Sequence, residues 1–235
     1  MMYLGGKSRI AKPIARAILE ANRQGEIKRY VEPFVGAANI LGLVAPRLPK
    51  PHAGDLHEDL ILLLKAVRSG WKPPSRVSEA MYEGLRDAEP SALRGFVGFA
   101  CSFSGKWFGG YARDPLGGRD YASGAARGLV ALAPTLRRVD LRCIAYQDWD
   151  VGPGDLVYAD PPYAGRAGYS VGVFDSTRFW ATMDDWSERG AFVLVSEYKA
   201  PDNWTPIWQR SVSSTVAADK AGTDMARTER LWAPL

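Results

Sequence analysis

The chain has 235 residues, which is enough for one sizeable hydrophobic core and a small appended unit. Hydrophobic residues make up 46% of it and charged residues 24%, an ordinary balance for a globular protein. Its two cysteines give neither a disulfide framework nor a metal-ligand spacing, and no stretch has the pattern of a membrane span or a signal peptide. We therefore expect a cytoplasmic protein without a metal site. The net charge of +4 permits a polyanionic partner.

Two glycine-containing turns near the start have the composition of nucleotide-binding turns. The run Gly5-Gly6-Lys7 precedes a helical pattern, and backbone N–H groups and a lysine at such a place can approach an anion. A short predicted strand then leads into Glu32-Pro33-Phe34-Val35-Gly36, where Gly36 allows a tight turn into a helix predicted at about residues 37–44. The three-glycine dinucleotide fingerprint is absent, so each stretch alone is equally compatible with an ordinary turn.

The second predicted strand, residues 51–55, ends in an acid. An acid at this place can accept hydrogen bonds from both hydroxyl groups of a ribose. The same residue, Asp55, can also cap the helix predicted at residues 57–68. The two roles are compatible with each other.

From Trp71 the composition changes and predicts a separate unit. Helices are expected at residues 75–87, 90–99 and 121–138, around a loop of glycine, aromatic and basic residues with little periodicity. From position 94 to position 142 there are eight basic and three acidic residues, so the positive charge is concentrated here. Such a loop suits base stacking and phosphate contacts, although a lid packed by its own aromatic rings is the alternative. The candidate nucleic-acid contacts are Lys106, Trp107, Tyr111, Arg113 and Arg119.

The run Asp160-Pro161-Pro162-Tyr163 directly follows a predicted buried strand, residues 155–159. Ligands of open α/β sheets bind at the carboxyl ends of the strands. The prolines stiffen the backbone and leave its carbonyl groups free to accept, so this run suits a planar base that carries an amine. A strand predicted at residues 139–146 ends shortly before another acid, Asp148. After Tyr163 we expect a flap that contains Tyr169, and then a pair of strands near the end of the chain, at residues 207–216 and 228–233.

Taken together, these motifs resemble the Dam-like (D12 class) N6-adenine DNA methyltransferases, which use S-adenosylmethionine. The resemblance implies an α/β fold: a Rossmann-like class I methyltransferase sheet with helices on both faces, formed by residues 1–70 and 139–235. Residues 71–138 match least and occupy the place of the target-recognition insertion, expected to be small and mostly helical. The residues that carry the resemblance lie at 3–7, 32–36, 54–60, 160–163 and 227–232.

The resemblance also implies roles for single residues. Double-stranded DNA is the implied partner, the chain is expected to be a monomer or a weak dimer, and Tyr169 joins the candidate DNA contacts. The implied catalytic residues are Asp160, Pro161, Pro162 and Tyr163. The implied S-adenosylmethionine contacts are Tyr3, Gly6, Lys7, Glu32, Phe34, Gly36, Asp55, Asp148 and Asp160.

The chemistry of a methyl transfer to adenine fits the run at 160–163. The Asp160 carboxylate and the Pro161 carbonyl can accept the two N–H groups of adenine N6 and so direct its lone pair at a sulfonium methyl group. The base has to be flipped out of the duplex and stacked, with Tyr163 as the expected platform. Alternative acceptors are cytosine N4, RNA adenine or a protein side-chain amide, and a catalytically silent DNA-binding relative is a further alternative. The aspartate at position 160 favours adenine. The recognised sequence, a companion restriction enzyme and a phage-like origin stay open.

Overall fold

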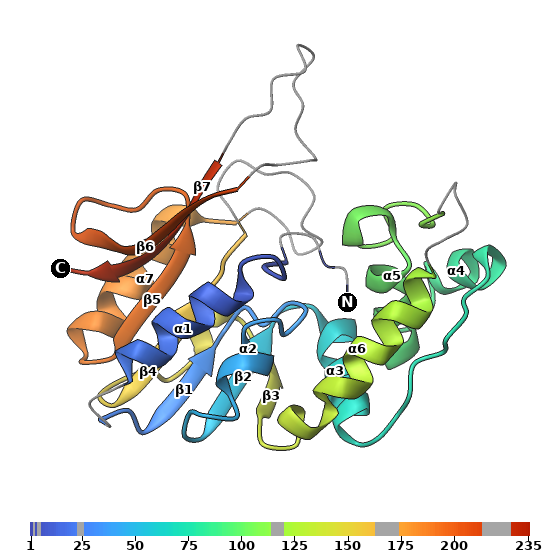
Figure 1. The fold of residues 1–235 in the computed structure, drawn as a ribbon, viewed down its shortest axis with the longest axis horizontal. Coiled ribbons are helices and arrows are strands. Elements are labelled where there is room, and N and C mark those ends of the chain that lie inside the picture. Colours follow the sequence, from blue (N-terminus) through green and yellow to red (C-terminus); the bar gives the residue numbers. More distant parts are fainter. Residues whose placement is uncertain (2, 4–5, 23–25, 114–119, 163–173, 213–226) are drawn as a thin grey trace, which may run out of the picture.

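The computed structural model describes residues 1, 3, 6–22, 26–113, 120–162, 174–212 and 227–235. Its centre is a seven-stranded sheet in the order β3-β2-β1-β4-β5-β7-β6 (Figure 1). No helix of these residues has the length and apolar character to cross a membrane. The strands are β1 (Arg29–Glu32), β2 (Pro51–Asp55), β3 (Asp140–Cys143), β4 (Asp155–Ala159), β5 (Phe192–Glu197), β6 (Trp204–Val212) and β7 (Arg227–Pro234).

The order of the strands reverses between β1 and β4. The chain moves outward from β1 through β2 to β3 and then returns to the other side of β1 as β4, with all these neighbours parallel. Such a switch point leaves a crevice at the carboxyl ends of the two central strands, where ligands of doubly wound sheets bind. Next to β5, strand β7 runs antiparallel to both β5 and β6, which confirms the predicted pairing of the last two strands.

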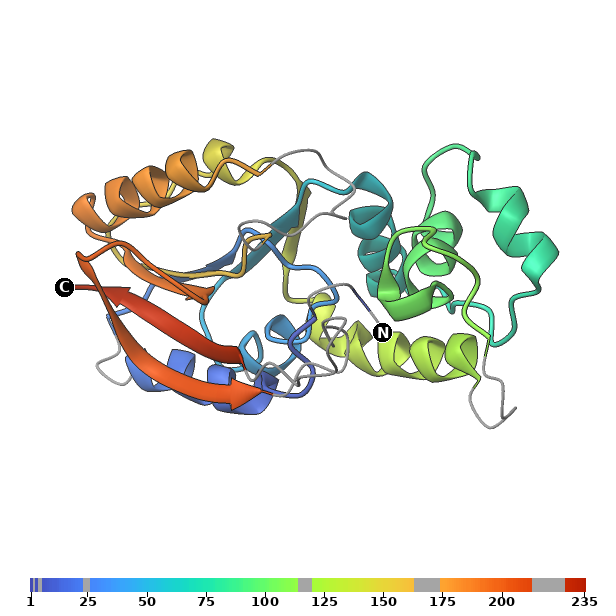
Figure 2. The same ribbon diagram turned by 90° about the horizontal axis from the view of Figure 1, so that it is seen from above.

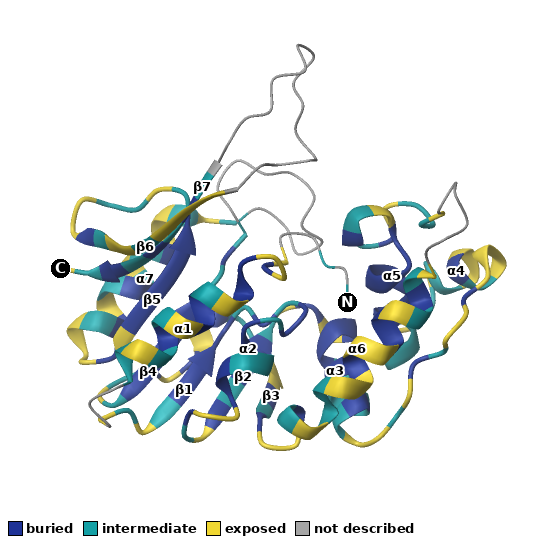
Figure 3. Cartoon of the chain, in the orientation of Figure 1, coloured by how far each residue is buried: buried dark blue, intermediate teal, exposed yellow. Residues whose placement is uncertain are grey.

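Alternating side chains of the central strands face two separate cores. On β4, Leu156 and Tyr158 belong to the core that contains α1 (Ala11–Ala21) and α2 (Leu41–Val44), while Val157 and Ala159 pack with α7 (Ser176–Glu188). This period of two is the geometry of a strand buried on both sides, and β4 is buried along its whole length (Figure 3). Figure 2 shows α1 and α7 on opposite sides of the sheet. The predicted Rossmann-like sheet with helices on both faces is confirmed.

A group of helices lies beside the β3 edge of the sheet (Figure 1). Buried residues of this group, such as Phe96 and Leu129, belong to the same core as α1 and α2. The segment 71–138 therefore continues the main core, and its division from the rest as a recognition unit stays a prediction. The helices of the group are α3 (Glu58–Arg68), α4 (Glu79–Leu85), α5 (Ala92–Ala100) and α6 (Tyr121–Leu136).

Two predicted elements are shorter than expected, and both differences shape the cavity described below. Of the helix predicted at 37–44, only the part from Leu41 to Val44 forms, as α2. The chain before it is not helical, because Gly36 and Ala38 take positive φ angles of 46° and 57°, which a right-handed helix does not allow. The strand predicted at 139–146 ends at Cys143, since β2, its partner, ends at Asp55. The chain then forms a short 3-10 helix, η2 (Tyr146–Asp148).

An ion pair joins two helices of this group, α3 and α5, and its loss should be costly. Asp59 on α3 accepts from Arg94 Nη1 at 2.7 Å and from the Ser91 backbone N–H at 2.8 Å, with its side chain only 4% exposed. We predict that Asp59→Ala lowers the free energy of unfolding by about 3–5 kcal/mol, because the Arg94 guanidinium, only 16% exposed, is left without its counter-charge. Denaturant titration measures this.

The control is Glu83→Ala, which breaks the exposed pair with Arg86. Its effect should stay below about 1 kcal/mol. Equal losses in the two variants would contradict the structural role of Asp59.

Candidate active site

A cavity of about 330 Å³ lies at the switch point of the sheet. The turn after β1, the tip of β2, the segment after β3 and the end of β4 all contribute to its wall, as does the N-terminal turn. Its volume is in the range of small-molecule sites. Most of the residues predicted to bind the cofactor line it, namely Tyr3, Gly6, Lys7, Glu32, Phe34, Gly36, Asp55 and Asp160, together with Pro161 and Pro162.

The carboxylate of Asp55 joins two turns of the cavity wall. Its Oδ2 accepts from the Gly36 N–H at 3.1 Å and its Oδ1 from the His57 N–H at 3.0 Å. Burial raises the pKa of Asp55 to about 6, although these backbone donors favour its charged form. The predicted role of Asp55 as a helix cap is wrong, because α3 begins after His57 and the N–H from which Asp55 accepts belongs to His57 itself, outside the helix. A carboxylate has about four acceptor sites, so it also keeps capacity for a ligand hydroxyl.

Glu32, at the end of β1, is the most deeply buried acid of the cavity wall, at 2% exposure. The Tyr30 hydroxyl donates to its Oε2 at 2.7 Å. Burial raises the pKa of Glu32 to about 8, and the charge of Asp160 acts in the same direction, against the hydrogen bonds from Tyr30 and from the Leu41 backbone. Burial in the cavity wall thus favours the protonated form of Glu32.

Lys7 lies between two acids of the cavity wall. Its Nζ is 3.1 Å from Asp160 Oδ1 and 3.4 Å from Glu229 Oε2, and its side chain is only 6% exposed. Asp160 comes directly after β4 and Glu229 belongs to β7, so one ammonium group links the N-terminal turn to two strands. Sequence reasoning found Lys7 and Asp160 but gave no role to Glu229. The only signal for Glu229 was its place in the terminal motif.

Aromatic rings form another part of the wall. The Phe34 ring lies 5.3 Å from that of Tyr146, which sequence reasoning missed, and 6.2 Å from that of Phe174, which it placed in the flap over the site. The predicted contact Asp148 is exposed and does not line the cavity, whereas its neighbour Gln147 does. The reason is that η2 replaces the end of the predicted strand and turns the side chains around it. Among the residues that the structure describes, no group of three or more His, Cys, Asp or Glu side chains could hold a metal ion.

The predicted DNA-contact residues differ in what they touch. Trp107 packs against His57 at 4.2 Å between ring centroids and against Phe99 at 4.6 Å, and the Tyr111 hydroxyl donates to the Val77 carbonyl at 2.6 Å. These two rings thus serve the internal packing of the loop, as the alternative interpretation of a self-packed lid expects.

The remaining loop candidates lie at the surface or outside the described residues. Lys106 is exposed, and the exposed Arg113 forms an ion pair with Glu79. The aromatic ring most available to a partner is Phe103, 69% exposed, which sequence reasoning missed. The predicted residues Arg119, Tyr163 and Tyr169 lie outside the residues that the structure describes.

Comparison with known proteins covers the cavity motifs of the first 90 residues. The family model of the D12 class N6 adenine-specific DNA methyltransferases matches residues 3–90. The predicted family resemblance is confirmed over this region. The type II methyltransferase M.MjaIII of Methanocaldococcus jannaschii is similar to this chain, with 32% identity over 71 residues, or 29% of this chain and 25% of that protein. The match thus spans about a quarter of the length of that curated relative.

Two solved structures align with most of this chain at low sequence identity and low TM-score. A putative RNA methyltransferase from Pyrococcus horikoshii is 7% identical with a TM-score of 0.41, over 94% of this chain and 83% of that one. An S-adenosylmethionine-dependent methyltransferase from Agrobacterium tumefaciens is 10% identical with a TM-score of 0.43, over 97% of this chain and 60% of that one.

The turn after β1 should tolerate no side chain at position 36. Gly36 has a φ of 46°, and an added Cβ would lie 3.0 Å from the ring of Tyr3. We predict that Gly36→Ala lowers the free energy of unfolding by more than the roughly 1–2 kcal/mol that left-handed backbone strain costs, because the Tyr3 ring also has to move. Gly70→Ala is the control, since Gly70 has a φ of 97° and open space around it. Equal losses in denaturant titration would show that the contact with Tyr3 is unimportant.

The raised pKa of Glu32 predicts a pH-dependent stability. The folded protein holds the proton up to about pH 8, while an unfolded chain releases it near pH 4.5. This contribution to stability is therefore complete below the unfolded pKa and is lost as pH rises through the folded one, by at most about 1.4 kcal/mol per pH unit.

The expected difference lies between pH 6 and 8, where the unfolded chain has lost the Glu32 proton and the folded protein keeps it. There the free energy of unfolding of the wild type should fall more steeply with pH than that of Glu32→Gln. Other titrating groups cancel in this comparison. Parallel curves for the two proteins would contradict the assigned pKa.

Proposed function

We propose that this protein is a site-specific DNA methyltransferase that transfers a methyl group from S-adenosylmethionine to N6 of a flipped-out adenine in double-stranded DNA. The observation that carries the proposal is the cavity at the switch point. It brings the Asp160-Pro161-Pro162 end of β4 next to the Glu32–Gly36 turn and Asp55. The family match over residues 3–90 supports the same activity.

The residues of the cavity fit the proposed cofactor. Phe34 and Tyr146 offer aromatic faces to an adenine ring, and Asp55 offers acceptors to ribose hydroxyls. The acids Glu32, Asp160 and Glu229 suit a ligand with positive charge. When bound, S-adenosylmethionine supplies an electrophilic methyl group on a sulfonium sulfur.

The part of the protein in the transfer is to hold the acceptor amine. Adenine N6 is a poor nucleophile because its lone pair is delocalised into the ring. Hydrogen bonds from its two N–H groups to the Asp160 carboxylate and the Pro161 carbonyl would localise that lone pair and point it at the methyl group. Asp160 then lies at the place where the amine gains positive charge and loses a proton. Tyr163 is proposed to stack on the flipped base.

Contacts with the duplex are proposed for the loop between α5 and α6. Its exposed residues Lys106 and Arg113 suit phosphate contacts, and the exposed Phe103 offers an aromatic face to bases. Arg119 and Tyr169 are proposed for the same surface on the sequence alone. Transfer to cytosine N4 or RNA adenine and a catalytically silent DNA-binding relative are the alternatives, and the aspartate at position 160 favours adenine.

A methyl-transfer assay tests the proposal. The protein is incubated with methyl-labelled S-adenosylmethionine and unmethylated duplex DNA, and the DNA is digested to nucleosides. The expected product is labelled N6-methyl-2′-deoxyadenosine. Label in N4-methyl-2′-deoxycytidine, or no label in the DNA, would contradict the proposal.

The assigned role of Asp160 gives a mutational prediction. Asp160→Asn keeps the shape of the side chain but replaces a charged acceptor by a weaker one, and we expect kcat to fall by about 100-fold or more. Binding of S-adenosylmethionine, measured by calorimetry, should change far less than kcat, because the residue is proposed to act on the amine. A variant with near-normal kcat would refute this role.

A further inference from the structure

The strand β7 carries an acid among side chains that face the core. Side chains alternate along a strand, and Leu231 and Ala233 lie in the core that contains α1. Glu229 is the next residue of the same row, and it is buried at 7% exposure. Burying a carboxylate costs free energy unless an opposite charge lies next to it. The group that balances Glu229 therefore shows what this residue holds in place.

Lys7 balances the charge of Glu229. The Lys7 ammonium lies 3.4 Å from Glu229 Oε2 and 3.1 Å from Asp160 Oδ1. A lysine ammonium has three donors on one nitrogen, so it can hold both carboxylates at once.

We propose that Glu229 is a positioning residue of the active site and acts through Lys7. It fixes the Lys7 ammonium, which in turn holds Oδ1 of Asp160 and so sets the orientation of that carboxylate. A lysine has a flexible four-carbon stem, and a second anchor removes that freedom. The inference rests on the function proposed above for Asp160.

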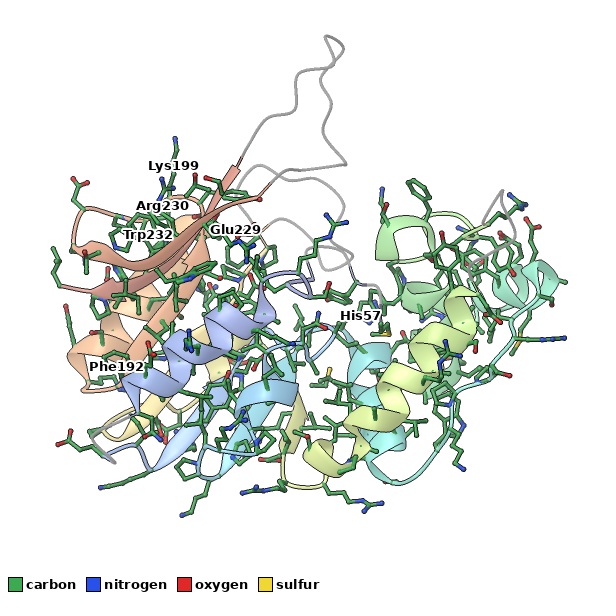
Figure 4. All side chains as sticks on the ribbon, viewed as in Figure 1. His57, Phe192, Lys199, Glu229, Arg230 and Trp232 are labelled. Carbon is green, nitrogen blue, oxygen red and sulfur yellow. The ribbon has the colours of Figure 1, made fainter. Side chains whose placement is uncertain are left out.

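The neighbours of Glu229 on β7 hold the strand in register. Trp232 Nε1 donates to the Glu197 carbonyl at 2.8 Å, and Arg230 Nη1 donates to the Tyr198 carbonyl at 2.6 Å, both at the end of β5. Figure 4 shows Glu229, Arg230 and Trp232 on this strand. The two faces of β7 in the motif at 227–232 thus have different contacts. Arg230 and Trp232 bind the end of β5 and the residue after it, whereas Glu229, on the opposite face, contacts Lys7.

A double-mutant cycle on kcat tests the proposal. Wild type, Glu229→Gln, Lys7→Met and the double variant are compared at saturating S-adenosylmethionine. Glu229→Gln keeps the shape and removes the charge, and we expect kcat to fall about tenfold while KM for DNA stays within about twofold. Because Glu229 acts through Lys7, the double variant should be no slower than Lys7→Met alone.

Two outcomes would overturn the proposal. One is a Glu229→Gln enzyme with the kcat of the wild type. The other is a double variant whose loss is the product of the two single losses, since Glu229 would then act independently of Lys7. A wild type without methyl transfer would instead refute the proposed function, and the two failures are therefore distinguishable.

The matched control is Asp155→Asn. Asp155 is also a buried, ion-paired acid, but it lies at the other end of β4 and pairs with Arg29. This variant should lose stability and keep the kcat of the wild type. If Asp155→Asn lowered kcat as much as Glu229→Gln, the effect would be general destabilisation and the positioning role would be wrong.

Discussion

The buried ammonium group of Lys7 connects segments that are far apart in the chain, and the geometry of the cavity depends on this connection. It lies within 3.4 Å of carboxylates at the end of β4 and on β7, while Lys7 itself precedes α1. Removing such charges from water costs several kcal/mol per ion, which the attraction between them only partly returns. The cluster is thus a weak source of stability. It is well suited to fixing the position of one carboxylate, that of Asp160.

The topology of the sheet explains why groups from separate segments meet here. Because the strand order reverses between β1 and β4, the turns that follow these strands move apart and leave a crevice. On one side of the crevice, Asp55 accepts hydrogen bonds from the amides of Gly36 and His57 and so joins the turn after β1 to the tip of β2. On another side, Lys7 joins the N-terminal turn to Asp160 and Glu229. The two carboxylate networks together define the wall around a ligand.

The features that depend on local pattern could be predicted from the sequence. Alternating and continuous apolar runs identified the strands that end at Asp55 and just before Asp160. Features that depend on distant partners could not be predicted. The strand before Asp148 is short because β2 ends, and Trp107 is half-buried because His57 and Phe99 pack against it. Glu229 was found only as part of a motif, since no spacing in the sequence shows that Lys7 lies next to it.

The charges of the cavity also bear on how the proposed reaction would turn over. Of the described residues that line the cavity, Lys7 is the buried cation, against the buried acids Glu32 and Glu229 and the carboxylates of Asp55 and Asp160. Such a wall favours a sulfonium over the neutral thioether that remains after methyl transfer. Burial works against this preference at Glu32, because it raises the pKa of that acid to about 8 and so favours its neutral form.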